Sequence, residues 1–170
     1  MDYIKEMGFT SIWLNPVLIN DMKEGSYHGY ATTDYYTTDP RFGSMDDYLE
    51  FSKKESQNGI KLIKDIIVNH CGLYHWWMDD LPTKDWLNHQ DKYIQTNHVH
   101  ETVFDPHVTR AQRDLFTDGW FVETMPDLNQ KNQFVANYLI QATMWWVEYI
   151  SLSSIRVDTY PYVDKNFLSV

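Results

Sequence analysis

The sequence predicts an α/β domain built on a parallel β-sheet. Helix and strand patterns alternate along its 170 residues in the order helix, strand, helix, strand, insertion, helix, strand. The clearest strand, residues 60–68, is a nearly continuous apolar run, which is typical of a parallel strand covered on both faces. Polar and charged side chains follow the strands, and parallel α/β folds gather functional groups at the carboxyl ends of their strands.

Composition fits one globular domain and argues against several classes of partner. Hydrophobic residues make up 43% of the chain and aromatic residues 16%, enough for a real core. Fourteen basic and 24 acidic residues give a net charge of −10 without a basic cluster, so we expect no nucleic acid and no anionic membrane as partner. The single cysteine, Cys71, excludes an intrachain disulfide. No apolar run approaches the ~20 residues of a membrane span and no signal peptide is recognisable, so localisation stays open between periplasm, exterior and cytoplasm.

The first helix and strand occupy the start of the chain. Residues 1–7 are expected to form a helix that Gly8 ends, and the β-prone run 9–14 is expected to be a buried strand. Segment 15–43 contains four tyrosines and is too long to be a mere connection. We interpret it as a long loop.

A second helix and strand follow this loop. Ser44 with Asp47 three residues later resembles a capping box, which predicts a helix that reaches about Asn58 and ends at a glycine. The strand at 60–68 contains Asp65, whose burial is costly because ionised groups are seldom buried unless they are paired.

Beyond residue 70 the regular pattern gives way to aromatic residues, histidines and short segments, with one helix expected near residues 109–116. We interpret 71–129 as a small inserted subdomain, and 1–70 with 130–170 as the main domain. The tryptophans of the insertion could form a sugar platform, but core packing is the better interpretation of Trp76, Trp77 and Trp86.

The last part of the chain returns to a regular pattern. A long helix is expected at 132–150, a strand at 152–158 and the start of another helix at 164–170. The long helix is indicated by apolar side chains that recur on one face, at Val135, Leu139, Ala142, Trp146 and Tyr149.

Three charged residues on two successive strands indicate a site. Arg156 and Asp158 are two positions apart in a strand, so their side chains point the same way. Successive parallel strands are neighbours in most such folds, so Asp65 can pair with Arg156. Asp65 would then be a structural acid, and Asp158 an exposed carboxylate able to act as a nucleophile. The alternative is an inert ion-pair network.

Polar and aromatic residues near the strand ends add to this set. Tyr27, His28 and Tyr30 with their glycine suit stacking on a sugar ring, because tyrosine has an apolar face and a polar tip. Ordinary loop packing is the alternative. Asn69 and His70 at a strand exit suit ligand hydrogen bonding, one metal contact or a satisfied turn. The histidines show no spacing that specifies a zinc site.

Four motifs stand in order along the chain: Tyr27-His28-Gly29-Tyr30, Asp65-Ile66-Ile67-Val68-Asn69-His70, Met125-Pro126-Asp127-Leu128-Asn129 and Ile155-Arg156-Val157-Asp158. Together they resemble the α-amylase family of glycoside hydrolases, glycoside hydrolase family 13, and the third motif resembles its neopullulanase and cyclomaltodextrinase branch. The resemblance covers essentially the whole chain. It implies a partial (β/α)8 TIM barrel, about strands 2 to 4, with residues 71–129 as the inserted subdomain B after strand 3.

The resemblance also implies roles. Asp158 matches the catalytic nucleophile and Arg156 the arginine that positions it. Substrate-binding positions of one subsite are matched by Tyr30, which would stack on the sugar, and by His28, Asp65 and His70. Asn69 and Asp127 match positions near calcium in many members, which makes a structural calcium ion the one cofactor to consider.

Two departures from the family pattern surround the nucleophile. Pro161 and Tyr162 stand where many α-amylases have a lysine-histidine pair, which puts typical calcium and outer-subsite chemistry in question. Ser153 and Ser154 precede Ile155 where a glycine is common, so a small residue remains at this position.

The implied activity is the cleavage, with retention, of α-glucosidic bonds in maltooligosaccharides, starch, pullulan or cyclodextrins by a longer parent enzyme, with an α-glucan as partner. A retaining glycosidase needs two carboxyl groups roughly 5 Å apart. Asp158 supplies the nucleophile, and in the family a glutamate after the fifth strand supplies the acid/base. We therefore expect these 170 residues to be inactive alone. A sugar-binding protein without catalysis on the same fold and a metal-dependent hydrolase stay open as alternatives.

Overall fold

A computed structural model describes residues 2–23 and 26–169. Within these ranges the regular elements, in chain order, are α1 (Asp2–Glu6), β1 (Ser11–Leu14), β2 (Leu18–Ile19), β3 (Asp34–Thr38), α2 (Met45–Gln57), β4 (Lys61–Ile66), α3 (Arg110–Asp118), α4 (Gln133–Tyr149) and β5 (Ser154–Val157). Short 3-10 helices lie at Trp76–Met78, His100–Val103, Tyr160–Tyr162 and Phe167–Ser169. None of the helices described combines the length and apolar character needed to cross a bilayer.

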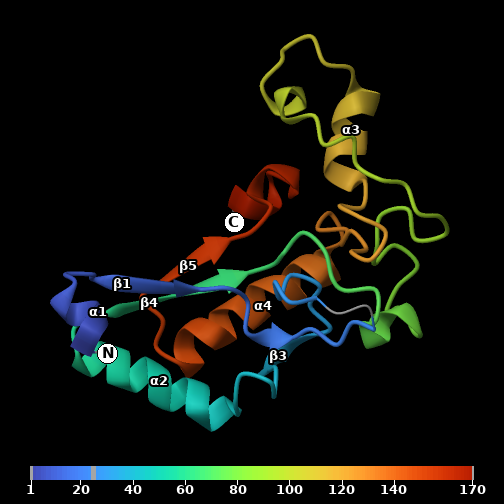
Figure 1. Cartoon of the computed structure of the whole chain (residues 1–170). Helices are drawn as coiled ribbons and strands as arrows, with labels where there is room; N and C mark the ends of the chain where they lie inside the picture. Colours follow the sequence, from blue (N-terminus) through green and yellow to red (C-terminus); the bar gives the residue numbers. More distant parts are fainter. Residues whose placement is uncertain (1, 24–25, 170) are drawn as a thin grey trace.

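The expected parallel sheet is confirmed. Strands β1, β4 and β5 lie side by side and parallel, with β4 in the centre (Figure 1). In this register Asp65 of β4 is directly opposite Arg156 of β5. The adjacency that the sequence predicted for these two residues is therefore confirmed. Because the three strands are parallel, their carboxyl ends lie at the same end of the sheet.

Helices α2 and α4 lie on one side of the sheet (Figure 1). The Lys64 ammonium group of β4 lies 5.3 Å from the ring centre of Tyr48 on α2 and 4.0 Å from that of Trp146 on α4. Because side chains alternate along a strand, Asp65 points to the opposite face. The fold thereby separates a helix-covered core from a face on which polar groups can gather.

Local sequence signals explain where the helices begin. Ser44 accepts from the backbone of Asp47, whose carboxylate in turn accepts from the Ser44 backbone, so the expected capping box starts α2. Thr109 and Gln112 form the same arrangement at α3. Asn132 caps α4 by accepting from the Phe134 backbone. The helices expected near 44–58, 109–116 and 132–150 are confirmed.

Three expectations were wrong in detail. Strand β1 is an edge strand and α1 buries none of its described side chains, so Trp13 is 50% exposed instead of buried. Segment 15–43 is no plain loop, because β2 and β3 form an antiparallel pair within it. Residues 167–169 form a 3-10 turn, not an α-helix. Residues 1 and 170 of the expected terminal helices lie outside the described residues.

The core is shared between the main elements and the segment 71–129. Trp77 and Trp86 are buried and pack with their rings against Tyr138 of α4. The core interpretation of these two tryptophans is confirmed, whereas Trp76 is 57% exposed. Segment 71–129 leaves β4 at its carboxyl end, and its helix α3 lies beyond that end of the sheet (Figure 1).

Replacing Lys64 with methionine is expected to remove a pH dependence of stability. Burial lowers the pKa of Lys64 to about 7 from a usual 10.5. Between these values the unfolded chain binds a proton that the folded chain lacks, so this residue makes the free energy of unfolding rise with pH. The rise from pH 6 to pH 9, measured by urea titration, should be roughly 2–3 kcal/mol larger in the wild type than in Lys64→Met.

Lys61→Met provides the matched control, because Lys61 is exposed on the same strand. In this variant the free energy of unfolding should rise between pH 6 and pH 9 as much as in the wild type. An equal rise in wild type and Lys64→Met would contradict the expectation.

Candidate active site

The Asp65 carboxylate is the centre of a polar cluster on the open face of the sheet. Its side chain is fully buried and lies at the end of β4. It accepts hydrogen bonds from Trp13 Nε1 at 3.0 Å, from the Tyr30 hydroxyl at 3.0 Å and from Arg156 Nη1 at 2.9 Å. Burial raises the pKa of Asp65, and the hydrogen bonds of Arg156, Tyr30 and Trp13 oppose that rise.

Arg156 joins the buried carboxylate to a second one nearer the surface. Its Nη1 donates to Asp65 and also to Asp158 Oδ1, at 2.6 Å. Its guanidinium carbon lies 5.0 Å from the ring centre of Trp13, which fixes the group from a third side. Burial lowers the pKa of Arg156, but its hydrogen bonds to Asp65 and Asp158 outweigh this effect and leave the pKa raised. The guanidinium is therefore always charged.

Asp158 stands at the carboxyl end of β5 with one carboxyl oxygen bound and the other open. Its backbone N–H donates to Ile66 O at 2.9 Å, which ties its position to β4. Among the described residues, Oδ2 has no hydrogen-bond partner, and the side chain is 16% exposed. Thr159 follows with φ of 50°, an outlier for a β-branched residue. Such strain is concentrated at functional sites.

A pocket of about 270 Å³ opens beside Asp158. Its wall is formed by side chains from four separate segments of the chain, namely His28 with Tyr30, His70, Phe121 with Met125, and Asp158 with Thr159. Four residues predicted for substrate binding or catalysis therefore meet in one pocket. Asp65 and Arg156 lie behind it and contact Tyr30 and Asp158.

The turn that carries His28 and Tyr30 packs closely against Pro16. Gly29 has φ of 83°, and a Cβ there would come 2.5 Å from Pro16 O, so only glycine fits. The His28 ring accepts from the Tyr30 backbone at 3.1 Å. Burial and the bond to Asp65 raise the pKa of Tyr30 to about 12, which keeps its hydroxyl protonated.

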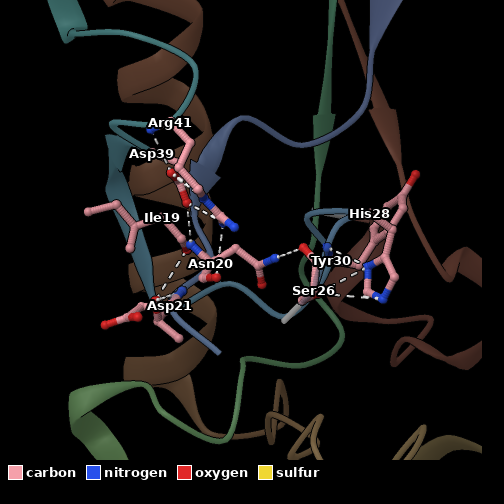
Figure 2. A network of polar contacts seen from close by, with 9 residues as sticks. Ile19, Asn20, Asp21, Ser26, His28, Tyr30, Asp39 and Arg41 are labelled. Atoms are coloured by element: carbon pink, nitrogen blue, oxygen red, sulfur yellow. Dashed lines mark hydrogen bonds and ion pairs between the residues drawn. The ribbon is translucent and has the colours of Figure 1, made fainter. Parts of the chain in front are cut away.

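Figure 2 shows the network that holds this turn. Asn20 donates to Ser26 O, and the Ser26 hydroxyl lies 3.3 Å from His28 Nδ1. The Asn20 backbone is itself fixed between Asp39, which accepts from its N–H at 3.2 Å, and Arg41, which donates to its carbonyl at 3.2 Å. The β2–β3 pair that the sequence analysis missed thus supports the turn for which the sequence indicated stacking on a sugar.

His70 is buried and held in one tautomer. Its Nε2 donates to Tyr30 O at 3.1 Å, and its Nδ1 faces Asn69 Nδ2 at 3.4 Å. Burial lowers the pKa of His70 to about 4, although the charge of Asp158 opposes this. The imidazole is therefore neutral at ordinary pH. It forms a flat wall together with Phe121, whose ring lies nearly parallel to it at 5.9 Å.

Asn69 and Asp127 lie deeper, outside the pocket. The Asp127 oxygens accept from Asn69 Nδ2 at 3.1 Å and from Asn88 Nδ2 at 2.8 Å, and the buried Asn69 Oδ1 has no hydrogen-bond partner among the described residues. Calcium takes six to eight oxygen ligands. Over residues 2–23 and 26–169, no three His, Cys, Asp or Glu side chains converge as a metal site requires. The assignment of Asn69 and Asp127 to a metal stays a prediction.

Sequence reasoning missed four contributors to the site. Trp13 could have been found, because it shares the facing direction of Asp65 once β1 and β4 are paired in parallel. Phe121 and Met125 reach the pocket only because segment 71–129 folds back over the sheet, although Met125 begins one of the four motifs, and Thr159 carried no signal in its residue type.

Comparison with known proteins agrees with this geometry. The family model described as "Alpha amylase, catalytic domain" matches residues 1–168. A cyclomaltodextrinase of Thermoanaerobacter pseudethanolicus is 32% identical over 98% of this chain, which covers 27% of that protein. An intracellular maltogenic amylase of Bacillus subtilis is 29% identical over 98% of this chain and 26% of its own length.

Solved structures give the same result. An α-amylase of Geobacillus thermoleovorans, solved in complex with acarbose, is 38% identical with a TM-score of 0.80, over 98% of this chain and 34% of that one. An Anoxybacillus α-amylase is 35% identical with a TM-score of 0.82, over 98% and 33%. The chain therefore spans about a quarter to a third of the length of these relatives.

Replacing Arg156 with methionine is expected to destabilise the protein by about 3–5 kcal/mol, because it leaves the Asp65 carboxylate buried without its cation. The free energy of unfolding in urea measures this. Adding Asp65→Asn to Arg156→Met removes the stranded charge, so the double variant should recover part of the loss.

Arg110→Met is the matched control, since Arg110 is 94% exposed and should change stability by no more than about 0.5 kcal/mol. The role of Arg156 would be refuted by an Arg156→Met variant as stable as this control.

Proposed function

This chain belongs to the α-amylase family of glycoside hydrolases, and we propose from that membership that the protein containing it cleaves α-glucosidic bonds in α-glucans with retention of configuration. One observation carries the proposal. Arg156 holds one oxygen of Asp158, and the other has no partner in the described part of the chain and lies beside a pocket lined by aromatic rings. The proposed substrates are maltooligosaccharides, starch, pullulan or cyclodextrins.

In the proposed mechanism Asp158 is the nucleophile. A retaining glycosidase forms a covalent glycosyl intermediate on a carboxylate. The hydrogen bond from Arg156 at 2.6 Å orients the carboxylate by holding its Oδ1. The free Oδ2 is the atom that attacks the anomeric carbon.

Tyr30, His28 and His70 would bind the sugar that is attacked. A sugar ring has apolar faces and a hydroxylated rim, so the aromatic face of Tyr30 suits the ring and the His28 imidazole suits the rim, while His70 contributes to the pocket wall. The Tyr30 hydroxyl is bound to Asp65 and the Tyr30 carbonyl to His70, which fixes the ring before substrate arrives. Asp65 is therefore proposed to act on substrate binding by orienting Tyr30.

The proton donor to the leaving oxygen is a separate group. Asp65 is unsuited, because its side chain is fully buried and its oxygens are taken by Trp13, Tyr30 and Arg156. Among the residues that line the pocket, Asp158 is the one carboxylate in the described part of the chain. We propose that a carboxyl group outside these 170 residues completes the site, so that the isolated chain hydrolyses nothing.

The same reasoning extends to the architecture. We propose that β1, β4 and β5 are about strands 2 to 4 of a (β/α)8 barrel and that residues 71–129 are its inserted subdomain B. The parallel order and the placement of Asp65, Arg156 and Asp158 toward one strand end support this, since barrel enzymes carry their active sites at the carboxyl ends of the strands.

Asp158→Asn in the protein that contains this chain is expected to lower kcat on maltoheptaose by at least about 10³-fold, because the amide cannot form the glycosyl intermediate. Binding of maltoheptaose should persist, since Tyr30 and the histidines are untouched. Reducing-sugar release measures the first and calorimetry the second.

Asp91→Asn is the control, because Asp91 is exposed and lies away from the pocket. Nuclear magnetic resonance of the first product should show the α-anomer. Full turnover by Asp158→Asn would refute the nucleophile, and sugar binding without product in the wild type would favour a binding protein instead.

A further inference from the structure

Tyr162 lies four residues after Asp158, in the 3-10 helix Tyr160–Tyr162, and is only 5% exposed. Its hydroxyl oxygen is 3.2 Å from His98 Nδ1 and 3.3 Å from His100 Nε2. A phenol can donate one hydrogen bond and accept another, so one imidazole can accept from it while the other donates to it. Both histidines come from segment 71–129, so these bonds join two distant parts of the chain.

Aromatic packing fixes the ring that carries this hydroxyl. Phe116 of α3 is completely buried and stacks on Tyr162 at 4.3 Å between ring centres, with an interplanar angle of 17°. Phe121 meets the same ring edge-on at 5.4 Å. Tyr162 is thus held at both its ring and its hydroxyl by segment 71–129.

The contacts of Tyr162 continue into the pocket through Phe121. The ring of Phe121 lies 5.0 Å from that of His98 and 5.9 Å from that of His70, and Phe121 lines the pocket with Asp158. The rings of His70, His98 and Tyr162 therefore set the position of Phe121. His98 and Tyr162 are also hydrogen-bonded to each other.

Backbone strain marks both ends of this connection. His98 has φ of 54° and Thr159 has φ of 50°, conformations that residues other than glycine seldom adopt. Strained conformations persist where surrounding contacts over-determine them. The hydrogen bond between His98 and Tyr162 therefore connects the strained backbone at His98 with the segment that contains the strained Thr159.

We propose that Tyr162 is a positioning residue for substrate binding, because its hydroxyl ties His98 and His100 to the turn after Asp158 and so fixes Phe121 as a wall of the pocket. This inference rests on the proposed function. Asp158 is held independently, by Arg156 and by the Ile66 carbonyl. Loss of the hydroxyl should therefore loosen the pocket wall without moving the nucleophile, which weakens binding and spares the chemical step.

The test compares Tyr162→Phe with Tyr160→Phe in the protein that contains this chain. Tyr162→Phe keeps the ring on Phe116 and removes only the hydroxyl, whereas Tyr160 is 58% exposed in the same turn. KM for maltoheptaose should rise about 2- to 10-fold in Tyr162→Phe, the range that one lost hydrogen bond produces, while kcat changes less than about twofold. Tyr160→Phe should match the wild type.

A second pair of variants keeps the test open if Tyr162→Phe folds poorly. His100 is exposed, so His100→Gln and His100→Leu should both fold. Glutamine can place a polar atom near the Nε2 position and should keep KM near the wild-type value, whereas leucine should raise it. Combining His100→Leu with Tyr162→Phe should raise KM by less than the product of the single effects.

The two hypotheses fail in different ways. A lower kcat at unchanged KM in Tyr162→Phe indicates only a smaller folded fraction and overturns the positioning role. The dissociation constant of maltoheptaose in the Asp158→Asn background measures the same effect without turnover. A wild type that binds but does not cleave, with weaker binding in Asp158→Asn/Tyr162→Phe, refutes the proposed function and retains the positioning role. Equal dissociation constants of maltoheptaose in Asp158→Asn and in Asp158→Asn/Tyr162→Phe overturn the positioning role.

Discussion

The buried carboxylate of Asp65 imposes the arrangement of the whole polar face. A charge that is withdrawn from water must be paired and hydrogen-bonded, and here Arg156, Tyr30 and Trp13 do this together. Each of these partners lies on a different segment. The hydrogen bonds of this one carboxylate therefore bring together the edge strand β1, the turn that carries Tyr30, and strand β5. Asp158 is then oriented by the same guanidinium.

Much of this could be predicted because the relevant rules are local. Strand alternation placed Arg156 and Asp158 on one face, and the cost of burying Asp65 required a partner on the neighbouring strand. The observed register, with Asp65 opposite Arg156, confirms that reasoning. Helix starts were predictable for the same reason, since a capping box such as that of Ser44 lies within a few residues. The division of the site into a buried acid and an accessible acid followed from their order along the strands.

What the sequence could not reveal depends on contacts between distant segments. The strand Asp34–Thr38 was hidden among tyrosines that equally suit a binding loop, and neither its pairing with Leu18–Ile19 nor the burial of Tyr35 has a local signal. The pocket wall at Phe121 and the bonds of Tyr162 to His98 and His100 arise only when segment 71–129 folds back. The left-handed backbone of Thr159 likewise has no signature in its residue type.

The separation in sequence between Asp65 and its cation has a consequence for synthesis. Arg156 is 91 residues away from Asp65, and ribosomes add about 5–20 residues per second. For about 5–18 s the nascent strand therefore carries Asp65 without the guanidinium of Arg156. During this interval the charge opposes burial of the strand in any non-native partner. The residue that specifies the finished site thus also disfavours non-native burial of its own strand while the remainder is made.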